Sequence, residues 1–247
     1  MKEWPTAAFY WLTTRLVWLA SHVFGRLEVR RDGDLPATGP AIVVSNHLNN
    51  ADPPLIGSVL RRRRIRFMAK AELFRVPVGG FFIRLFGAFP VRRFEADLAA
   101  LRTAQDLLAR GKVIGMFPEG HRSHGRGLLQ AQPGTALIAL RSGAPLVPVA
   151  LTGTEQVRSP LAFLHRPRAT VTVGEPFVLP RPERIDSAAV RAATDEMMLR
   201  IARLLPPTYR GAYSEMVESA GRRAPAGGGG AGVTPGRVLH DEGPSRG

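Results

Sequence analysis

The sequence predicts an α/β fold in which a mixed, largely parallel sheet is flanked by helices. Three short apolar runs, at residues 41–44, 113–117 and 146–151, have the length and composition of buried strands, and the first is rich in β-branched residues. Residues 96–110 and 187–205 repeat apolar side chains at intervals of three and four, as amphipathic helices do. Strands that alternate with helices along a chain form a sheet that is at least partly parallel.

Residues 5–25 are the most apolar and aromatic part of the chain, and we expect residues 1–25 to form an amphipathic, membrane-associating helical segment. Arg15 and the pair Thr13-Thr14 interrupt the stretch, whereas a membrane span needs about 20 unbroken apolar residues. A helix on a membrane surface, a helix in the core and a span all remain open, and a cleavable signal does not fit. The side chains expected to enter a headgroup region are Phe9, Tyr10, Trp11, Leu12, Leu16, Trp18 and Leu19, with Arg15 reaching back to water.

The remaining elements follow in order. Residues 27–31 alternate in polarity and predict an outer strand. After them we expect strands at 41–44, 67–70, 88–91, 113–117, 146–151 and 169–173, and helices from Asp52 and at 79–86, 96–110, 134–142 and 187–205. These elements predict one domain over residues 26–210. Residues 221–247 are rich in Gly, Pro and Arg and too poor in apolar side chains to order themselves, so we expect a disordered tail.

Composition narrows the partners and the chemistry. The chain carries a net charge of +14, almost all of it from arginine, so nucleic acid, anionic lipid or a phosphorylated small molecule are the partners to consider. It has no cysteine, which excludes disulfides, thiolate metal sites and thiol nucleophiles. His121-x-x-His124 has a metal-like spacing but no third ligand close by in the sequence, so neither a metal nor a cofactor is expected.

A histidine and an aspartate flank the loop after the first buried strand. His47 follows residues 41–44, and Asp52 precedes Pro53-Pro54, so the aspartate reads as the N-cap of a helix. The loops at the carboxyl ends of such strands are where α/β proteins bind substrates. A carboxylate that accepts one imidazole N–H fixes the tautomer and leaves the other nitrogen free to take a proton from a hydroxyl. The alternative is an ordinary N-cap aspartate beside a surface histidine.

Two further strands end in residues of the same kind. Arg92-Arg93 follows the strand at 88–91, and Pro118 to Arg122 follows the strand at 113–117. Each has an ordinary explanation, as a solvated strand end or as a turn. Their convergence with His47 at one sheet edge would suit proton abstraction beside a bound phosphate. The arginine run at 61–66 suits a helix end in solvent, anionic headgroups or a nucleotide-bearing acyl donor equally well.

Taken together, four blocks of sequence resemble the glycerolipid acyltransferases, and among them most closely the 1-acyl-sn-glycerol-3-phosphate acyltransferases. The blocks are Asn46-His47-x4-Asp52, Gly87 to Arg93, Phe117 to Ser123, and Val147-Pro148-Val149, in that order. They cover about residues 45–150, and all four in order are far more specific than the first alone. The resemblance implies a fold like that of glycerol-3-phosphate acyltransferase.

The resemblance also implies a reaction and a set of site residues. A fatty acyl group would pass from a thioester, on CoA or acyl carrier protein, to the sn-2 hydroxyl of lysophosphatidic acid, giving phosphatidic acid in phospholipid biosynthesis. His47 would be the general base and Asp52 its orienting partner, with direct attack and no acyl-enzyme. Residues implied in substrate binding are Lys70, Arg93, Glu119, Gly120 and Arg122. His121 stands where the family usually has threonine, which puts the acceptor pocket in doubt.

Such substrates partition into bilayers, so we expect the protein at the cytoplasmic face of the cell membrane, peripheral or monotopic, with an anionic membrane surface as a partner. Two alternatives stay open. The same chemistry could act on another acceptor, such as glycerol-3-phosphate or an amino-lipid. The protein could instead be a non-enzymatic binder of anionic lipid or nucleic acid. No helix-turn-helix, zinc or RNA-binding pattern is present, so no nucleic-acid partner is expected.

Overall fold

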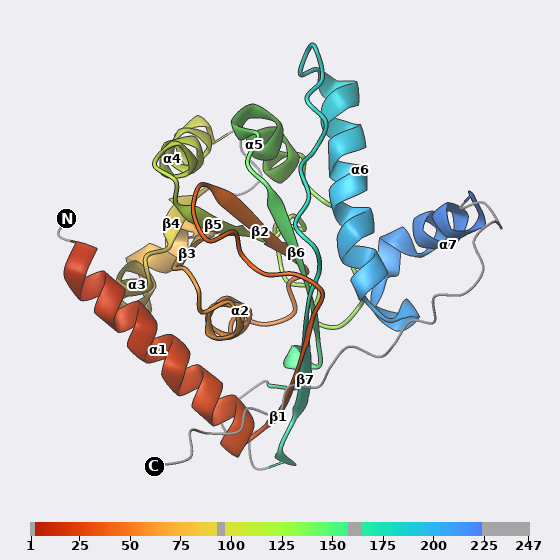
Figure 1. Ribbon diagram of the computed structural model, residues 1–247. Helices are drawn as coiled ribbons and strands as arrows, with labels where there is room; N and C mark the ends of the chain where they lie inside the picture. The colour runs from red at the N-terminus through yellow and green to blue at the C-terminus, as the bar shows by residue number, and fades with distance from the viewer. Residues whose placement is uncertain (1–2, 93–96, 158–164, 224–247) are drawn as a thin grey trace, which may run out of the picture.

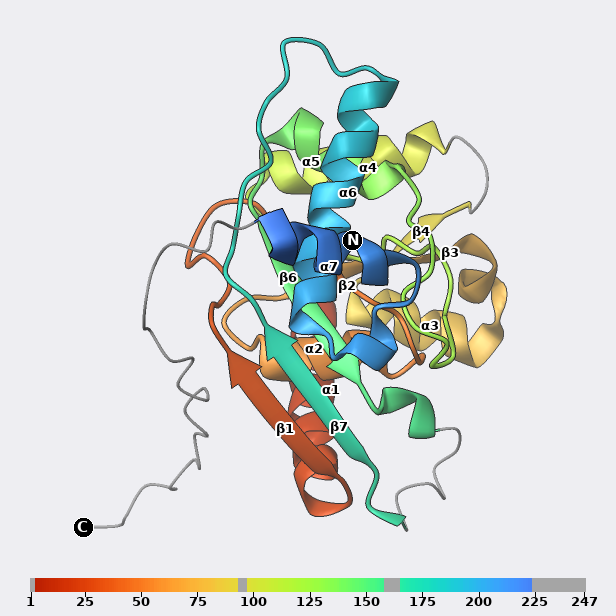
Figure 2. The same ribbon diagram turned by 90° about the vertical axis from the view of Figure 1, so that its right-hand side faces the viewer.

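The computed structural model describes residues 3–92, 97–157 and 165–223, and it confirms the predicted fold class. One mixed sheet has the strand order β1-β7-β6-β2-β5-β3-β4, and all neighbours are parallel except β6 and β7. Figure 2 shows β1 and β7 side by side at one end of this sheet. The strands are β1 (Arg26–Arg31), β2 (Ala41–Ser45), β3 (Ile65–Lys70), β4 (Phe89–Val91), β5 (Val113–Met116), β6 (Leu146–Thr152) and β7 (Arg168–Val173).

Helices cover both faces of the sheet and make a three-layer arrangement (Figure 1). Helices α1 and α2 pack on one side, and α4, α5 and α6 pack on the other. The α-helices are α1 (Glu3–Val23), α2 (Asp52–Val59), α3 (Pro77–Phe86), α4 (Leu98–Ala109), α5 (Gly134–Ser142), α6 (Ser187–Leu204) and α7 (Ser214–Arg223). Short 3-10 helices are η1 (Ala71–Arg75), η2 (Thr154–Gln156), η4 (Pro207–Tyr209) and η5 (Gly211–Tyr213).

The central strand β2 explains why its sequence is continuously apolar. Ala41 and Val43 belong to the core beneath α2, whereas Ile42 and Val44 belong to the core beneath α4, α5 and α6. A strand that is buried on both faces has no solvent side on which polar residues could alternate. The loop that follows β2 is therefore attached to the most rigid part of the sheet.

Helix α1 packs against the rest of the domain through Tyr10. This side chain is fully buried, and its hydroxyl accepts a hydrogen bond from the Ile65 N–H at 3.2 Å. Burial raises the pKa of Tyr10 to about 12. Gly57 of α2 permits the close approach, because a Cβ there would lie 2.7 Å from the Tyr10 hydroxyl oxygen.

This packing corrects part of the expected membrane face. Tyr10 cannot enter a headgroup region, because its ring and hydroxyl are committed to the core. The exposed side of α1 includes leucines at four- and three-residue intervals, with Arg15 among them. The exposed leucines are Leu12, Leu16 and Leu19, whereas Phe9, Trp11 and Trp18 are half-buried. No described helix is long and apolar enough to cross a membrane.

The C-terminal part of the domain extends further than the sequence suggested. After residue 210 the chain continues through η5 and α7, where Tyr213 is buried and Met216 and Val217 pack against the core. Helix α7 reaches residue 223, so the expected boundary of the tail at 221 is wrong by three residues. Residues 224–247, most of the expected tail, lie outside the described residues.

Candidate active site

The loops that follow β2 and β5 meet at one edge of the sheet. These two strands are parallel neighbours, so their carboxyl ends lie side by side. The contact between the loops is direct, because the Ser123 N–H donates a hydrogen bond to the His47 carbonyl oxygen at 2.8 Å. The predicted convergence is confirmed for these two loops.

His47 and Asp52 form the predicted pair. The Nδ1–H of His47 donates to Asp52 Oδ2 at 2.9 Å, since a carboxylate oxygen can only accept there. The same oxygen accepts the backbone N–H groups of Leu48 and Asn49, each at 2.7 Å. Asp52 is fully buried and His47 is 7% exposed. The three donors hold the carboxylate in place and leave Nε2 as the nitrogen that can take a proton.

The surroundings of Asp52 contradict its expected role as an N-cap. Ala51 occupies the N-cap position of α2 and makes no side-chain capping bond, while Asp52 is the first residue of the helix. Its carboxylate turns back over the loop toward His47 because the three N–H donors of residues 47–49 are all on that side. The ordinary alternative, a surface histidine beside a helix cap, does not describe this buried pair.

An aromatic stack fixes the plane of the imidazole. The ring of Phe117 lies against that of His47 with centroids 4.0 Å apart and an interplanar angle of 17°. Phe67 extends the series, with its ring centroid 5.8 Å from that of Phe117. Gly115 leaves the room for this, because a Cβ there would lie 2.4 Å from the Phe67 ring. Phe117 opens the third sequence block, and its place directly before Pro118 was the signal for a role beside His47.

Asn46, which the first sequence block contains without an assigned role, is a second positioning residue. Its amide oxygen accepts the Leu151 N–H and its amide nitrogen donates to the Leu151 carbonyl, both at 2.8 Å. This pair of bonds ties the end of β2 to the end of β6, one residue before His47. The available signal was an amide at the buried end of an apolar strand, since a buried amide must be paired.

Glu119 is buried beside the backbone of His47. Its side chain is fully buried; Oε1 accepts the His47 N–H at 2.8 Å and Oε2 accepts the Leu129 N–H at 2.9 Å. Both oxygens therefore position the backbone, and a role of Glu119 in substrate binding stays a prediction. Burial raises the pKa of Glu119 to about 7, against the opposing effect of its two N–H donors.

We expect the variant Glu119→Gln to reveal this titration in the pH dependence of stability. Between pH 4.5, the ordinary pKa of a glutamate side chain, and about pH 7, folded Glu119 keeps its proton whereas the unfolded chain loses it. The free energy of unfolding of the wild type should therefore fall relative to the variant as pH rises across this interval, and level off above it. Denaturant unfolding of both proteins from pH 5 to 8 measures the difference. If the wild type instead gained stability relative to the variant as pH rises, the two N–H donors would outweigh burial in setting the pKa of Glu119.

Gly120 lines an apolar cavity of about 480 Å³. It adopts a φ of +75°, which favours glycine, and closes a turn through its N–H to the Phe117 carbonyl. The cavity lies between β4, β5, α4 and α5, and its walls include Met68, Val91, Leu101, Met116, Phe117 and Ile138. Because Phe117 is both a wall of the cavity and the ring stacked on His47, the cavity adjoins the candidate base.

The predicted phosphate-binding residues are not all at one place. Arg122 is partly buried and lines a second, polar cavity of about 420 Å³ together with Asn49, His124 and Glu155. Lys70 lies two strands away from β2, at the end of β3, where its Nζ is 3.5 Å from Glu72 Oε1. Arg93 lies outside the described residues. The loops after β2 and β5 thus carry His47, Asp52, Glu119, Gly120 and Arg122, and Lys70 ends the strand on the other side of β5 at the same edge of the sheet.

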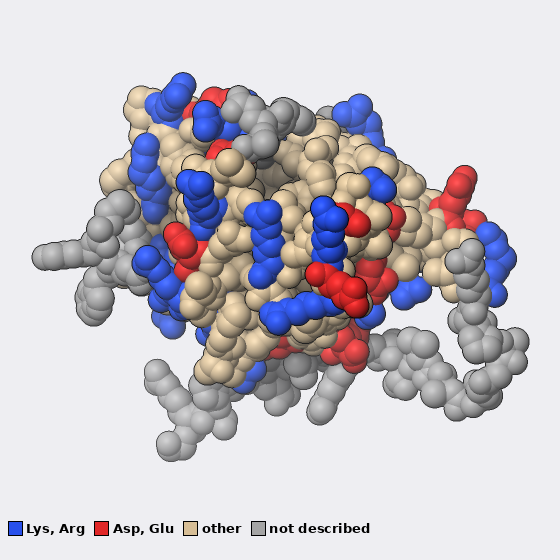
Figure 3. Space-filling model, turned by 90° about the horizontal axis from the view of Figure 1, so that it is seen from above, with Lys and Arg blue, Asp and Glu red and all other residues tan. Residues whose placement is uncertain are grey.

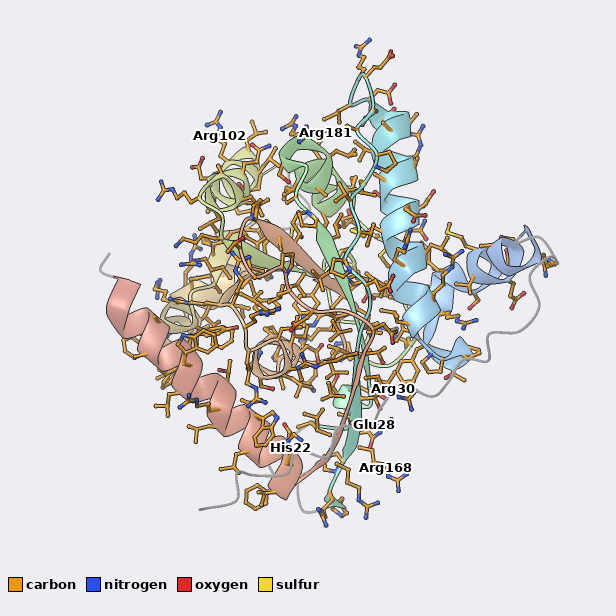
Figure 4. All side chains as sticks on the ribbon, viewed as in Figure 1. His22, Glu28, Arg30, Arg102, Arg168 and Arg181 are labelled. Carbon is orange, nitrogen blue, oxygen red and sulfur yellow. The ribbon has the colours of Figure 1, made fainter. Side chains whose placement is uncertain are left out.

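Positive charge is spread over the molecule. On the face seen from above, lysines and arginines are separated by uncharged and acidic residues (Figure 3). Arg102 and Arg181 lie at one end of the molecule and Arg30 and Arg168 at the other, all exposed (Figure 4). A single basic stripe, as nucleic-acid binding requires, is not what these views show. Within the described part of the chain, no three His, Asp or Glu side chains are grouped so that they could hold a metal ion.

A buried His–Asp pair at the carboxyl edge of an α/β sheet, beside an apolar cavity, is typical of enzymes that work by proton transfer to and from a substrate. The sequence profile of the acyltransferase family matches residues 26–152, just over half of the 247 residues. The chain therefore belongs to the acyltransferase family, and the elements from β1 to β6 that carry the site all lie within the matched part.

Two relatives carry the name of one enzyme, and a solved structure shares the fold. The 1-acyl-sn-glycerol-3-phosphate acyltransferase of Bacillus subtilis is 29% identical over 186 residues, which are 73% of this chain and 88% of that protein. The enzyme of the same name from Escherichia coli is 31% identical over 144 residues, 54% of this chain and 58% of that protein. The crystal structure of the 1-acyl-sn-glycerophosphate (LPA) acyltransferase PlsC from Thermotoga maritima shares the fold, with a TM-score of 0.59 and 22% identity over 87% of this chain and 79% of that one.

Proposed function

We propose that this enzyme is a 1-acyl-sn-glycerol-3-phosphate acyltransferase, which transfers a fatty acyl group from a CoA or acyl-carrier-protein thioester to the sn-2 hydroxyl of lysophosphatidic acid. The observation that carries the proposal is the buried His47–Asp52 pair beside the apolar cavity. The names of the relatives from B. subtilis and E. coli support the same acceptor and product.

The pair supplies the proton transfers of the reaction. Nε2 of His47 takes the proton of the acceptor hydroxyl as that oxygen attacks the thioester carbonyl carbon. A C–O bond forms and the C–S bond breaks, and the proton then passes from His47 to the departing sulfur. The Asp52 carboxylate stabilises the imidazolium that exists between these two transfers. The hydroxyl attacks directly, so no acyl-enzyme is formed.

The apolar cavity is suited to the acyl chain that is transferred. Its lining is mainly aliphatic and aromatic, and Phe117 in its wall is stacked on His47. A chain buried in the cavity would lose contact with water along its length, which is the main source of binding energy for such a group. Its carbonyl end would then emerge at the turn of Gly120, beside the candidate base.

Incubation with labelled acyl-CoA and lysophosphatidic acid, followed by lipid separation, tests the proposal. We expect labelled phosphatidic acid. Product formed from glycerol-3-phosphate or an amino-lipid, and none from lysophosphatidic acid, would change the acceptor and keep the chemistry. A salt-sensitive shift with nucleic acid and no acyl transfer to any acceptor would instead favour a binding protein.

We expect Arg122→Ala to raise the KM for lysophosphatidic acid by about 10- to 100-fold, because a charged hydrogen bond to phosphate is worth about 1.5–3 kcal/mol. The KM for acyl-CoA should change much less. Initial rates with each substrate varied in turn measure both constants. Arg30→Ala, which removes an exposed arginine paired with Glu28 on β1, is the matched control and should change neither. An equal rise in the KM values for both substrates would show that Arg122 does not belong to the acceptor site.

We also propose that the enzyme works as a peripheral or monotopic protein on an anionic membrane at the cytoplasmic face. Lysophosphatidic acid and acyl chains both partition into bilayers. The outer side of α1 exposes Leu12, Leu16 and Leu19 with Arg15 beside them, which suits insertion at the headgroup level. Deleting residues 1–25 would also remove Tyr10 from the core, so substitutions at the exposed leucines are the cleaner test of this contact.

A further inference from the structure

The polar cavity beside the two site loops contains a carboxylate that the proposed reaction does not use. Its walls include Asn49 of the loop after β2, Arg122 and His124 of the loop after β5, and Glu155. Glu155 belongs to η2, which follows β6, and β6 ends at the same edge of the sheet as its parallel neighbour β2. An arginine at this place suits a phosphate. A carboxylate beside it needs another explanation, because it repels an anion.

One carboxylate oxygen of Glu155 is paired inside the protein and the other is not. The hydroxyl of Tyr209 donates to Oε1 at 2.6 Å and accepts the Gly153 N–H at 3.3 Å. Burial, followed by the hydrogen bond to Glu155, raises the pKa of Tyr209 to about 12, so this hydroxyl keeps its proton. Oε2 is buried and has no hydrogen-bond partner among the described residues. A buried oxygen of this kind is unfavourable unless a ligand supplies the donor.

The packing around η2 fixes where this carboxylate lies. The carbonyl oxygen of Tyr209 accepts the Leu128 N–H at 3.0 Å, so the same residue joins η2 to the loop after β5. Gly125 of that loop allows a close approach, because a Cβ there would lie 3.0 Å from the Glu155 Cγ. Glu155 is thus a preset part of the cavity wall rather than a side chain that turns away into solvent.

A ligand that suits both an arginine and an unpaired carboxylate oxygen carries a negative charge and an O–H donor. A phosphomonoester that retains one proton is such a group, with P–O⁻ oxygens for Arg122 and a P–OH for Glu155. A phosphodiester has the charge and lacks the P–OH. A site that is built to bind a hydroxyl rejects an analogue without one, because its own polar group is then left unpaired.

We propose that Glu155 is a specificity-determining residue, which selects a phosphomonoester acceptor over phosphodiester lysophospholipids by accepting a hydrogen bond from the P–OH of the headgroup. The proposal rests on the proposed function, in which lysophosphatidic acid is the acceptor. Arg122 alone would hold either kind of phosphate, because both are anionic. The unpaired oxygen of Glu155 adds the discrimination between them.

The test compares short-chain lysophosphatidic acid with its phosphate monomethyl ester, which keeps the sn-2 hydroxyl and one negative charge and has no P–OH. At pH 6 we expect the wild type to prefer the free acid in kcat/KM by about 10-fold or more, the effect of one charged hydrogen bond. Glu155→Gln should bring this preference close to one, because its amide N–H can donate to either phosphate. The matched control is Glu175→Gln, an exposed residue after β7 at the opposite edge of the sheet, which should keep the wild-type preference.

A pH series distinguishes recognition of the proton from a structural role of Glu155. A phosphomonoester loses its second proton with a pKa of about 6, so the wild-type preference should fall from pH 5.5 to pH 8. The preference of Glu155→Gln should stay flat. The elements that pack around η2 carry these titratable or charged residues among those described: Arg122, His124, Arg126, Arg168 and Tyr209. Histidine is the residue type among them that ordinarily titrates in this range, so His124→Gln is measured as well and should show the wild-type fall.

Each further outcome decides the role of Glu155. Equal kcat/KM values of the wild type for the two esters would overturn the proposal. So would a folded Glu155→Gln variant, checked by circular dichroism, that keeps the full preference and its fall with pH. If the wild type transfers no acyl group to lysophosphatidic acid, the proposed function fails. Equilibrium binding of both esters without a donor then gives the same comparison, and tighter binding of the free acid by the wild type alone would support the role of Glu155.

Discussion

His47→Ala is expected to lower kcat by about 10²–10⁴-fold, because a positioned general base contributes that much to a proton-transfer step. The fold should survive. The Asp52 carboxylate still accepts hydrogen bonds from the N–H groups of Leu48 and Asn49 after the imidazole is removed, so the loop after β2 keeps its conformation. The measurement is a steady-state rate with saturating acyl-CoA and lysophosphatidic acid, beside a thermal unfolding curve.

The matched control for this variant is His121→Ala, which removes an exposed histidine from the loop that contacts His47. It should retain most of the activity, because the buried pair of His47 and Asp52 stays intact when His121 is replaced. If folded His47→Ala turns over at a rate near that of the wild type, the base is another group. If the control loses as much activity as His47→Ala, the loop as a whole is needed and not the one imidazole.

The pair could be found from the sequence because its geometry is local. Five positions separate the two residues, and a strand end followed by a helix start leaves few ways for that loop to close. The strand itself was recognisable because β2 is buried on both faces and so reads as an unbroken apolar run. What the sequence did not contain was the direction of the Asp52 carboxylate, which is set by backbone N–H groups inside the loop.

The hydrogen bonds of Glu119 could not be predicted from local sequence in the same way. A charged residue in a polar turn after a strand is normally exposed. The sequence around such a residue is the same whether its side chain contacts a ligand or the protein's own backbone. Only the tertiary fold places the His47 N–H at one of its oxygens and the Leu129 N–H at the other. The exposure of apolar side chains on η1 and α3 could not be predicted from the sequence for a related reason. An apolar run such as residues 76–83 predicts burial, and only packing shows which side chains were left outside.

Asp52→Asn is the variant that separates charge from geometry, and we expect it to lower kcat on the order of 10²–10⁴-fold. The N–H groups of Leu48 and Asn49 point at Oδ2, so the amide oxygen should take that position and still accept the Nδ1–H of His47. The amide nitrogen then occupies the place of Oδ1, which is buried without a hydrogen-bond partner among the described residues. The tautomer is retained, and the negative charge that stabilises the imidazolium is lost.

The companion variant Asp52→Ala removes the acceptor altogether and leaves two buried backbone N–H groups unpaired, at about 1–3 kcal/mol each. It should therefore unfold at a clearly lower temperature than Asp52→Asn, whereas both should be nearly inactive. Single-turnover rates beside thermal unfolding distinguish the two effects. A kcat near that of the wild type in Asp52→Asn would mean that His47 acts without an anionic partner. Parallel losses of stability and activity in both variants would mean that Asp52 serves only to hold the loop.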